Sequence, residues 1–406
     1  MKKMFFFAAA ATIAFVSCTK DIEVPANNNV ANNEPAISFQ VGSSFDVAVR
    51  AAVGGTGIGT DLNNWAGQTL HVYMFKQNSM TPAYNKTSRT NYFENTPVYA
   101  PTTGATGTAS YGAPQYYPTS GNFDFFAYHA GGAATASPQP VLNEHRDTTA
   151  YTLAVTIDGT HDLMVAKAWL NGADSATYKT KLNEQLADAD KIVDFTDAKF
   201  GTACGRVYSA YSARRGIQPR FTFEHLLSRF VFKAEAAEED ATGDNGIKIE
   251  KIEVAGVQVN GVMTIASLAG DLKVDFAGQS KTLELKDAEG NPMEEASLTW
   301  NPAENKGESE QLGESMLLPA GVTEYVAKIY YKQNKKKVLE NGNVTYTLIE
   351  DVYEAPIKLA SRAQFKPGFQ YTVNIKVYDF QEIVLTADLT AWEESDEQPE
   401  ELDPEK

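Results

Sequence analysis

The side chains that most often carry out chemistry are scattered along this 406-residue chain. The histidines have no zinc-ligand spacing, and they are His71, His129, His145, His161 and His225. The chain has no G-x-S-x-G motif and no cysteine–histidine signature of a nucleophilic enzyme. A glycine-rich stretch at 54–59 lacks the lysine and the helical pattern of a phosphate loop, which favours a flexible loop. We therefore expect no enzymatic activity, no metal and no cofactor.

The first candidate for chemistry is Cys18, because of what precedes it. Lys2 and Lys3 stand before an apolar run at 4–16, which is the pattern of a secretion signal. This run is too short to span a bilayer as a stable helix. The small residues just before Cys18 resemble a bacterial lipobox, in which this cysteine becomes the lipidated first residue. A plain cleaved signal with an incidental cysteine is the alternative.

These features predict the organisation of the N-terminus. We expect a signal peptide at 1–17 and a lipidated, Asn-rich flexible tether at 18–36, with membrane contact through the lipid alone. Cys204 would then have no disulfide partner, so we expect it to be a small core residue.

The second candidate is Arg50, at the end of a strand-like stretch. Between 37 and 49 the apolar residues fall on odd positions, which predicts a half-buried strand. They are Ile37, Phe39, Val41, Phe45, Val47 and Val49. Arg50, Ala51 and a glycine-rich loop follow, so a trypsin-like protease could cut between Arg50 and Ala51 and release this strand as a propeptide, 37–50. The alternative is an exposed loop arginine that is never processed.

Composition sets the broad class of the protein. The length suits two domains of ordinary size, and 43% hydrophobic with 21% charged residues is a normal globular balance. The net charge of −17 argues against a nucleic-acid partner or an anionic membrane surface, because both need a basic face. An acidic, self-repelling surface of this kind is typical of a soluble domain.

Short alternating or apolar stretches between glycine and proline turns predict an all-β fold with two β-sandwich domains in tandem. Examples are 70–75, 123–130, 371–377 and 383–391. Charges, Gly and Pro at 213–219 suggest a boundary, which gives domains at 51–218 and 219–392. An acidic tail without apolar periodicity follows at 393–406.

Several stretches together resemble the fimbrillin family of Bacteroidales, the major and accessory subunits of type V pili. They are Cys18, 49–51, 70–75, 123–129, 162–166, 221–228, 317–319 and 369–392. The resemblance implies two transthyretin-like domains, lipidation at Cys18, export to the cell surface and cutting after Arg50 by an arginine-specific protease. A neighbouring fimbrial subunit would then fill the vacated groove by donor-strand exchange, serving adhesion to an unknown surface ligand. Donor-strand exchange is consistent with the chemistry of strands, because an unpaired strand edge beside an apolar slot is a template for strand addition.

The candidate donor strand lies at the C-terminus and has the same period-2 pattern as the stretch 37–49. Its apolar positions are Ile383, Leu385, Ala387, Leu389 and Ala391. If this strand is instead a fixed member of its own sheet, the subunit offers only an acceptor groove and belongs at the pilus tip. Sequence leaves both possibilities open.

Two other functions stay open at this stage. A monomeric surface lipoprotein could bind glycans through aromatic loops such as 111–117, although loop aromatics more often pack locally. An extracellular hydrolase would need a pair of carboxylates in a cleft, and no pair stands out.

Asn341-Gly342 predicts a hairpin turn, with Lys335, Lys336 and Lys337 beside a solvated tip.

Overall fold

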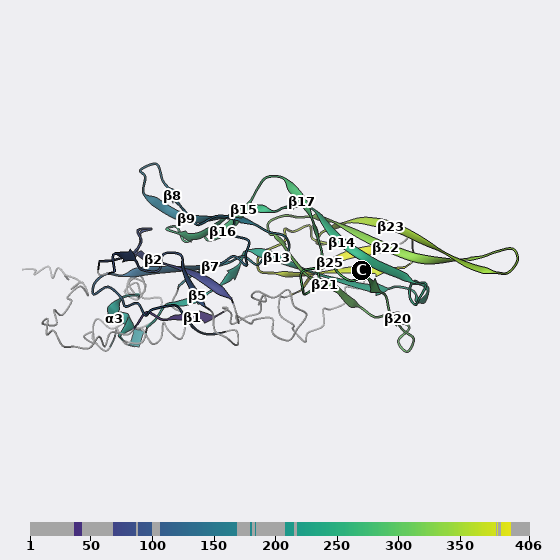
Figure 1. Cartoon of the computed structure of the whole chain (residues 1–406), viewed down its shortest axis with the longest axis horizontal. Coiled ribbons are helices and arrows are strands. Elements are labelled where there is room, and N and C mark those ends of the chain that lie inside the picture. The colour runs from purple at the N-terminus through teal and green to yellow at the C-terminus, as the bar shows by residue number, and fades with distance from the viewer. Residues whose placement is uncertain are drawn as a thin grey trace, which may run out of the picture.

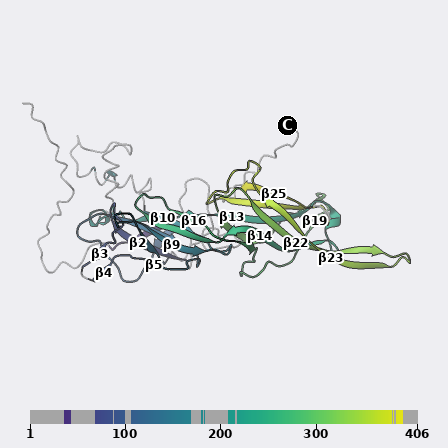
Figure 2. The same cartoon turned by 90° about the horizontal axis from the view of Figure 1, so that it is seen from above.

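The computed structural model describes residues 36–42, 68–86, 88–99, 106–168, 179–180, 183, 208–214, 217–378, 380 and 383–390. The described part is elongated and built almost wholly of strands (Figure 1). Strands from the first half of the chain lie at one end of the long axis, and the strands nearest the C-terminus lie toward the other (Figures 1 and 2). The all-β prediction is confirmed.

A five-stranded antiparallel sheet organises the first half of the chain. Its order is β12 (Glu224–His225), β10 (Met164–Lys167), β7 (Phe123–His129), β2 (Thr69–Lys76) and β5 (Thr96–Tyr99). The central strands β7 and β2 are apolar along most of their length because both faces of this sheet are covered.

The two faces of this sheet serve different cores. In β2, Leu70, Val72 and Met74 pack into one buried cluster, whereas Tyr73 and Phe75 pack into another. Successive strand side chains point to opposite faces, so one strand can contribute to both. The first cluster lies against a small sheet with the order β11 (Arg220–Thr222), β1 (Phe39–Gly42) and β6 (Thr106–Ala109).

The second cluster runs on into the rest of the molecule. It contacts an antiparallel sheet with the order β16 (Lys273–Phe276), β15 (Asn260–Ser267), β9 (Thr148–Thr156) and β8 (Gln139–Leu142). Thus β9 of the first half pairs with β15 of the second half. Smaller elements of the first half are β3 (Tyr84–Asn85), β4 (Thr90–Asn91) and the short helix α3 (Ala210–Ala213).

Two further sheets share the core of the second half. One has the order β21 (Glu310–Pro319), β13 (Leu227–Ala236), β24 (Gln370–Val377) and β25 (Ile383–Thr390), with β13 and β24 parallel. The other has the order β17 (Ser280–Glu284), β14 (Ile247–Gln258), β22 (Tyr325–Val338) and β23 (Val344–Ile357). Short elements are the 3-10 turn η2 (Glu239–Ala241), β18 (Ala296–Ser297), which pairs with β14, and the pair β19 (Trp300–Asn301) and β20 (Lys306–Gly307).

The tandem division at 218/219 stays a prediction. The sheets connect the expected domains, because β12 pairs with β10 and β15 pairs with β9; β11 also pairs with β1, which lies in the predicted propeptide. The signal peptide, the tether and the acidic tail lie outside the described residues.

Candidate functional site: the slot of the first strand

Strand β1 is held on both sides by strands from distant parts of the chain. It pairs antiparallel with β6, where Phe39 faces Ala109, and parallel with β11, where Val41 faces Phe221. The Ile37 amide donates a 2.8 Å hydrogen bond to the carbonyl of Gln115, which extends the pairing toward the N-terminus. We call the gap between β6 and β11 that β1 fills the β1 slot. Removing β1 would leave one edge of each neighbour unpaired.

The ring of Phe39 fills an aromatic cluster beneath β1. Its centroid lies 4.9 Å from that of Phe93, 5.7 Å from those of Tyr111 and Phe125, and 5.5 Å from that of Phe221. Phe39 and Ile37 are fully buried. Because aromatic rings bury large apolar areas and gain from edge-on packing, this residue ties the strand to the core.

Polar contacts hold the start of the strand in register. The Gln218 side chain acts as both acceptor and donor: its Oε1 accepts from the Ser38 amide and its Nε2 donates to the Ala36 carbonyl, each at 3.2 Å. The Tyr111 hydroxyl donates to the carbonyl of Ile37. Sequence reasoning singled out neither Gln218 nor Tyr111 as a contact of this strand, since only long-range folding brings them to it.

The described residues include some, but not all, of the predicted site residues at the N-terminus. Ile37 and Phe39 lie buried at the β1 slot, and Val41 lies within β1. Cys18, Phe45, Val47, Val49, Arg50 and Ala51 lie outside the described residues. Lipidation, cutting and release of the strand therefore stay predictions.

The candidate donor strand is β25, paired with β24. The register runs from Gln370↔Thr390 to Val377↔Ile383, and β25 is the last strand of its sheet, with a single parallel bridge from Ala387 to Leu359 on its outer side. Ile383 and Ala387 are buried, Leu385 is partly buried, Leu389 faces Tyr371 in the register, and Ala391 lies outside the described residues. An edge strand can leave without splitting its sheet, but its release would expose the buried side chains.

The tyrosine-rich loop at 111–117 is turned mainly inward. Tyr117 is buried, and Tyr111 packs its ring on Phe39 and Phe93. Tyr116 is exposed. This loop therefore helps to build the β1 slot rather than forming a flat stacking platform for a sugar.

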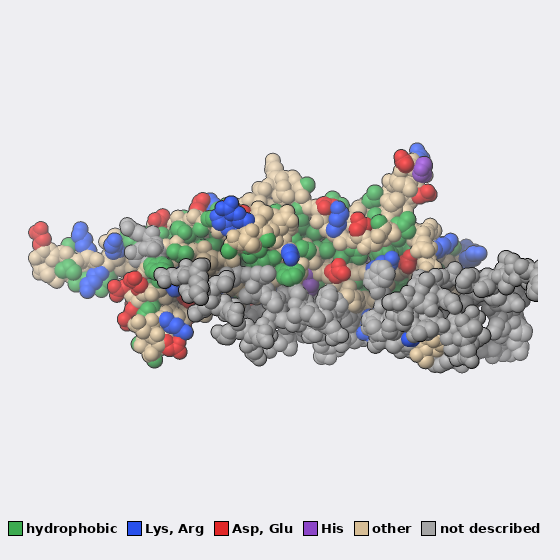
Figure 3. Space-filling view, turned by 180° about the vertical axis from the view of Figure 1, so that it is seen from behind, with side chains coloured by type: hydrophobic (Ala, Val, Ile, Leu, Met, Phe, Trp, Pro, Cys, Tyr) green, Lys and Arg blue, Asp and Glu red, His purple; other side chains and the backbone are tan. Residues whose placement is uncertain are grey.

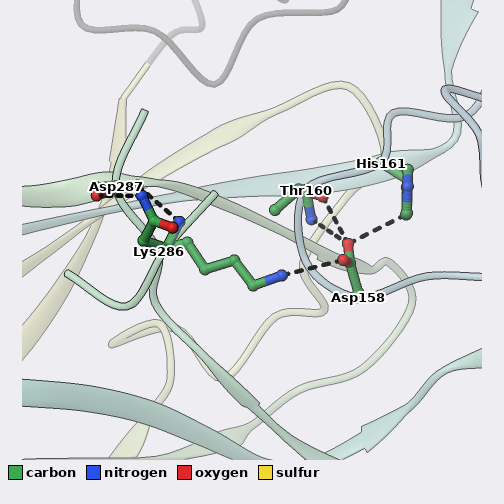
Figure 4. A network of polar contacts seen from close by, with 6 residues as sticks. Asp158, Thr160, His161, Lys286 and Asp287 are labelled. Carbon is green, nitrogen blue, oxygen red and sulfur yellow. Dashed lines mark hydrogen bonds and ion pairs between the residues drawn. The ribbon is translucent and has the colours of Figure 1, made fainter. Parts of the chain in front are cut away.

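A polar cleft of about 1050 Å³ opens where the two halves of the chain meet. Its lining includes His71, Asn95, His129, Asp158, Asp162 and Lys286. Figure 4 shows Asp158 at the centre of a network: Lys286 Nζ lies 3.1 Å from Oδ2, and Thr160 Oγ1 donates to Oδ1 at 2.6 Å. His161 Nδ1 lies 3.1 Å from the same Oδ1. Lys286 and Asp158 come from different halves, so this pair joins them.

The electrostatics of Asp158 follow from its partners. Burial by itself would raise the pKa of this carboxyl group, but hydrogen bonds from the Thr160 hydroxyl and amide, the charge of His161 and the hydrogen bond from Lys286 outweigh it and bring the pKa to about 2. No nucleophilic thiol or serine hydroxyl belongs to the network of Figure 4. The arrangement connects segments from the two halves of the chain.

A second, buried group of charges lies nearby. His225 Nδ1 is 2.8 Å from Asp162 Oδ2; the Asp162 side chain is buried and that of His225 is 9% exposed. Arg229 and Glu314 are also buried, and burial lowers the pKa of Arg229 while the charges of Glu314 and Asp162 oppose that shift. Buried charges need compensating partners, which Glu314 and Asp162 supply to Arg229. In the part of the chain that is described, no group of three His, Cys, Asp or Glu side chains could hold a metal ion.

The fold and the β1 slot define an all-β protein in which β1 is held in the core by strands from distant parts of the chain. The sequence matches the model of the fimbrillin-like family over residues 56–392, and the chain belongs to that family. Membership points to a structural, non-enzymatic protein, as expected from the sequence, and supports a role as a fimbrial subunit at the cell surface that interacts with other subunits.

Solved structures give distant similarities. A fimbrial protein from Bacteroides vulgatus is 11% identical, with 88% of this chain and 100% of that chain covered and a TM-score of 0.47. The fimbrial anchor protein Mfa2 from Porphyromonas gingivalis is 11% identical, with 87% and 97% covered and a TM-score of 0.31. No curated protein matches the sequence. Within the described residues, no helix has the length and apolar character needed to cross a membrane.

Proposed function

We propose that this chain is the precursor of a fimbrial subunit that is assembled by strand exchange at the β1 slot. The precursor is lipidated at Cys18, exported to the outer membrane and cut after Arg50 by an arginine-specific protease. Loss of the strand that starts at Ile37 opens the slot, and an extended segment of a neighbouring subunit takes its place. The two-sided pairing of β1 and the buried ring of Phe39 are the observation that carries this proposal.

Physical chemistry supports each step after the cut. An empty β1 slot would expose the unpaired edges of β6 and β11 together with the aromatic cluster around Phe39. Main-chain hydrogen bonds would then give affinity to an incoming strand, and a side chain in the place of Phe39 would give specificity. The replacement strand thus restores the main-chain pairing and the buried side chain that β1 supplies in the precursor.

The cleavage step is tested by treating the full precursor with an arginine-specific protease. We expect a new N-terminus at Ala51 and, after removal of the released peptide, a ladder of oligomers on a denaturing gel. An Arg50→Lys variant is the matched control, because trypsin still cuts it and an arginine-specific protease does not. A precursor that forms the same ladder uncut, or stays monomeric after the cut, would contradict the proposal.

For the donor we propose β25, whose edge position permits release. Paired cysteines at Asn374→Cys and Thr386→Cys, which face each other across β24 and β25, would staple the strand to its own sheet. We expect the stapled subunit to accept a donor but not to give one, with donation restored by a reducing agent. If the stapled chain still forms long ladders, β25 is not the donor. If the unstapled chain only accepts, the subunit belongs at the tip.

A monomeric glycan-binding lipoprotein is the second candidate from the sequence. The inward packing of Tyr111 and Tyr117 does not favour it. It predicts retention of the unassembled chain on a polysaccharide affinity gel, which the fimbrial proposal does not require.

A further inference from the structure

The hairpin of β22 and β23 extends beyond the body of the molecule. Pairing between β14 and β22 reaches as far as Ile247↔Gln333, whereas β22 and β23 stay paired out to Val338↔Val344. Figures 1 and 2 show this end of the hairpin projecting along the long axis. We call residues 334–348 the distal ribbon. Within the described chain, the sheet pairing of the ribbon strands is with each other.

The distal ribbon has one apolar face. The register pairs Asn334 with Leu348, Lys336 with Tyr346, and Val338 with Val344, and side chains of paired residues lie on the same face. Four of these six are large apolar side chains with high exposed fractions: Val338 63%, Val344 45%, Tyr346 51% and Leu348 52%. Figure 3 shows apolar side chains mixed with charged ones at this projecting end.

The opposite face of the ribbon is polar. It carries the register pairs Lys335↔Thr347 and Lys337↔Thr345, all of them exposed. Because the ribbon stands clear of the body, its apolar residues do not serve the protein's own core. An isolated two-stranded ribbon is at best marginally stable in water, so a partner that covers the apolar face would stabilise it.

The outer edge of β23 carries different kinds of residue next to the body and in the ribbon. Next to the body it carries Glu350, Asp351, Glu354 and Pro356, the kinds of residue that block pairing with another chain. The ribbon segment of β23, Val344 to Leu348, has neither a charge nor a proline. The charged residues and the proline that protect this edge against pairing therefore end where the ribbon begins.

Charge identifies the partner. Lys335, Lys336 and Lys337 lie together at the exposed ribbon, in a chain whose net charge is −17. Two ribbons that meet through their apolar faces would bring Lys336 close to its own copy, which is unfavourable, whereas the acidic body of another subunit is complementary to it. We propose that the distal ribbon docks through its apolar face, on which Lys336 also lies, on the acidic body of a second copy of this chain.

Such a contact joins two different surfaces of the same protein. Contacts of that type form open filaments when the rotation between copies does not close a ring. The inference rests on the proposed function for its biological meaning, since it gives neighbouring subunits a second contact beside strand exchange. It is nevertheless measurable without strand exchange.

The test uses the purified full chain carrying Arg50→Ala, so that the first strand is retained. We expect concentration-dependent self-association in sedimentation velocity. Tyr346→Thr with Leu348→Thr keeps strand-forming residues but removes the apolar face, and we expect it to raise the half-association concentration about tenfold or more. Thr345→Ser with Thr347→Ser, on the opposite face, is the matched control and should change little.

Two further measurements identify the surface that is bound. A photoreactive phenylalanine derivative at Tyr346 should crosslink to acidic segments of the partner's body, mapped by mass spectrometry. About 1 M salt, which shortens the Debye length to about 3 Å, should weaken the association. Crosslinks between two ribbons would overturn the proposed arrangement.

The outcomes separate the two proposals. If the unprocessed chain is monomeric at all concentrations, or if the apolar-face variant associates like the parent, the ribbon contact is wrong while strand exchange is untouched. If the processed chain forms no ladder but the unprocessed chain associates through the ribbon, the proposed function fails and the ribbon contact stands.

Discussion

The ring of Phe39 packs 5.5 Å from the ring of Phe221, centroid to centroid, while their strands β1 and β11 run parallel. Residues near the two ends of the first half of the chain are thereby brought into one core. The relationship explains why the first strand is well held: its backbone pairing and the contacts of its ring are both supplied by residues outside its own sequence neighbourhood.

Truncation of this ring should be costly in the precursor. We expect Phe39→Ala to lower the free energy of unfolding by about 3–5 kcal/mol, since it deletes a fully buried ring from the aromatic cluster. Denaturant unfolding of the uncut chain measures the effect. Ser38→Ala, at the neighbouring half-buried position, is the control and should cost much less. Equal effects at the two positions would contradict the packing described for β1.

Gln218 should control how firmly the start of the strand is held. Gln218→Ala removes an acceptor for the Ser38 amide and a donor for the Ala36 carbonyl, at about 0.5–1.5 kcal/mol for each hydrogen bond. We expect faster hydrogen exchange at the Ser38 amide. Gln218→Glu keeps the acceptor and loses the donor, so it should protect that amide better than alanine does. Unchanged exchange in the alanine variant would show that the side chain is dispensable.

Asp158 should give a stability contribution that depends on pH. Its folded-state pKa of about 2 is below the ordinary value of 3.8, so the contribution is full above about pH 4 and is lost as the pH falls toward about 2. We expect Asp158→Asn to destabilise the protein at neutral pH by a modest amount, because the side chain is 44% exposed. The difference from the parent should shrink between about pH 4 and pH 2.

Thermal unfolding of both proteins across this pH range makes the measurement. Glu289→Gln, an exposed carboxylate near the same cleft, is the matched control and should show no such convergence. A constant difference at all pH values would mean that the charge of Asp158 does not stabilise the network.

The contributions of Arg229 and Glu314 to the free energy of unfolding should depend on each other. Arg229→Met leaves the buried carboxylate without this cation, and we expect a loss of about 3–5 kcal/mol of stability. Adding Glu314→Gln should recover part of that loss, so the double variant should be more stable than the sum of the single changes predicts. Denaturant unfolding of the four proteins completes the cycle, and simple additivity would argue against coupling.

Local patterns in the sequence predicted many elements of the fold. The alternation of Tyr371, Val373, Ile375 and Val377 predicted β24, and all four are buried in the core. Asn341-Gly342 predicted the hairpin of β22 and β23, where Gly342 has a φ of +79° that suits glycine. These features depend on neighbouring residues, so they can be read before any long-range contact is known.

The contacts of the candidate site needed the tertiary structure. Nothing near Phe39 in the sequence indicates that it meets Phe93 and Phe221, or that Gln218 holds the backbone beside it. The resemblance of the 221–228 stretch to a family pattern pointed to this region but not to its contact with Phe39. The apolar face of the distal ribbon was equally hidden, because an exposed strand and a buried one share the same alternation.

The sequence by itself determined the all-β character, the alternating stretch that begins at Ile37 and the strongly acidic charge, because each depends on residue type and short spacing. The tertiary structure decided that β1 fills a slot between β6 and β11 and that β9 pairs with β15, joining the two halves. Strand pairing uses main-chain groups that every residue carries, so the choice of partner strand is set by how the whole chain packs its apolar faces.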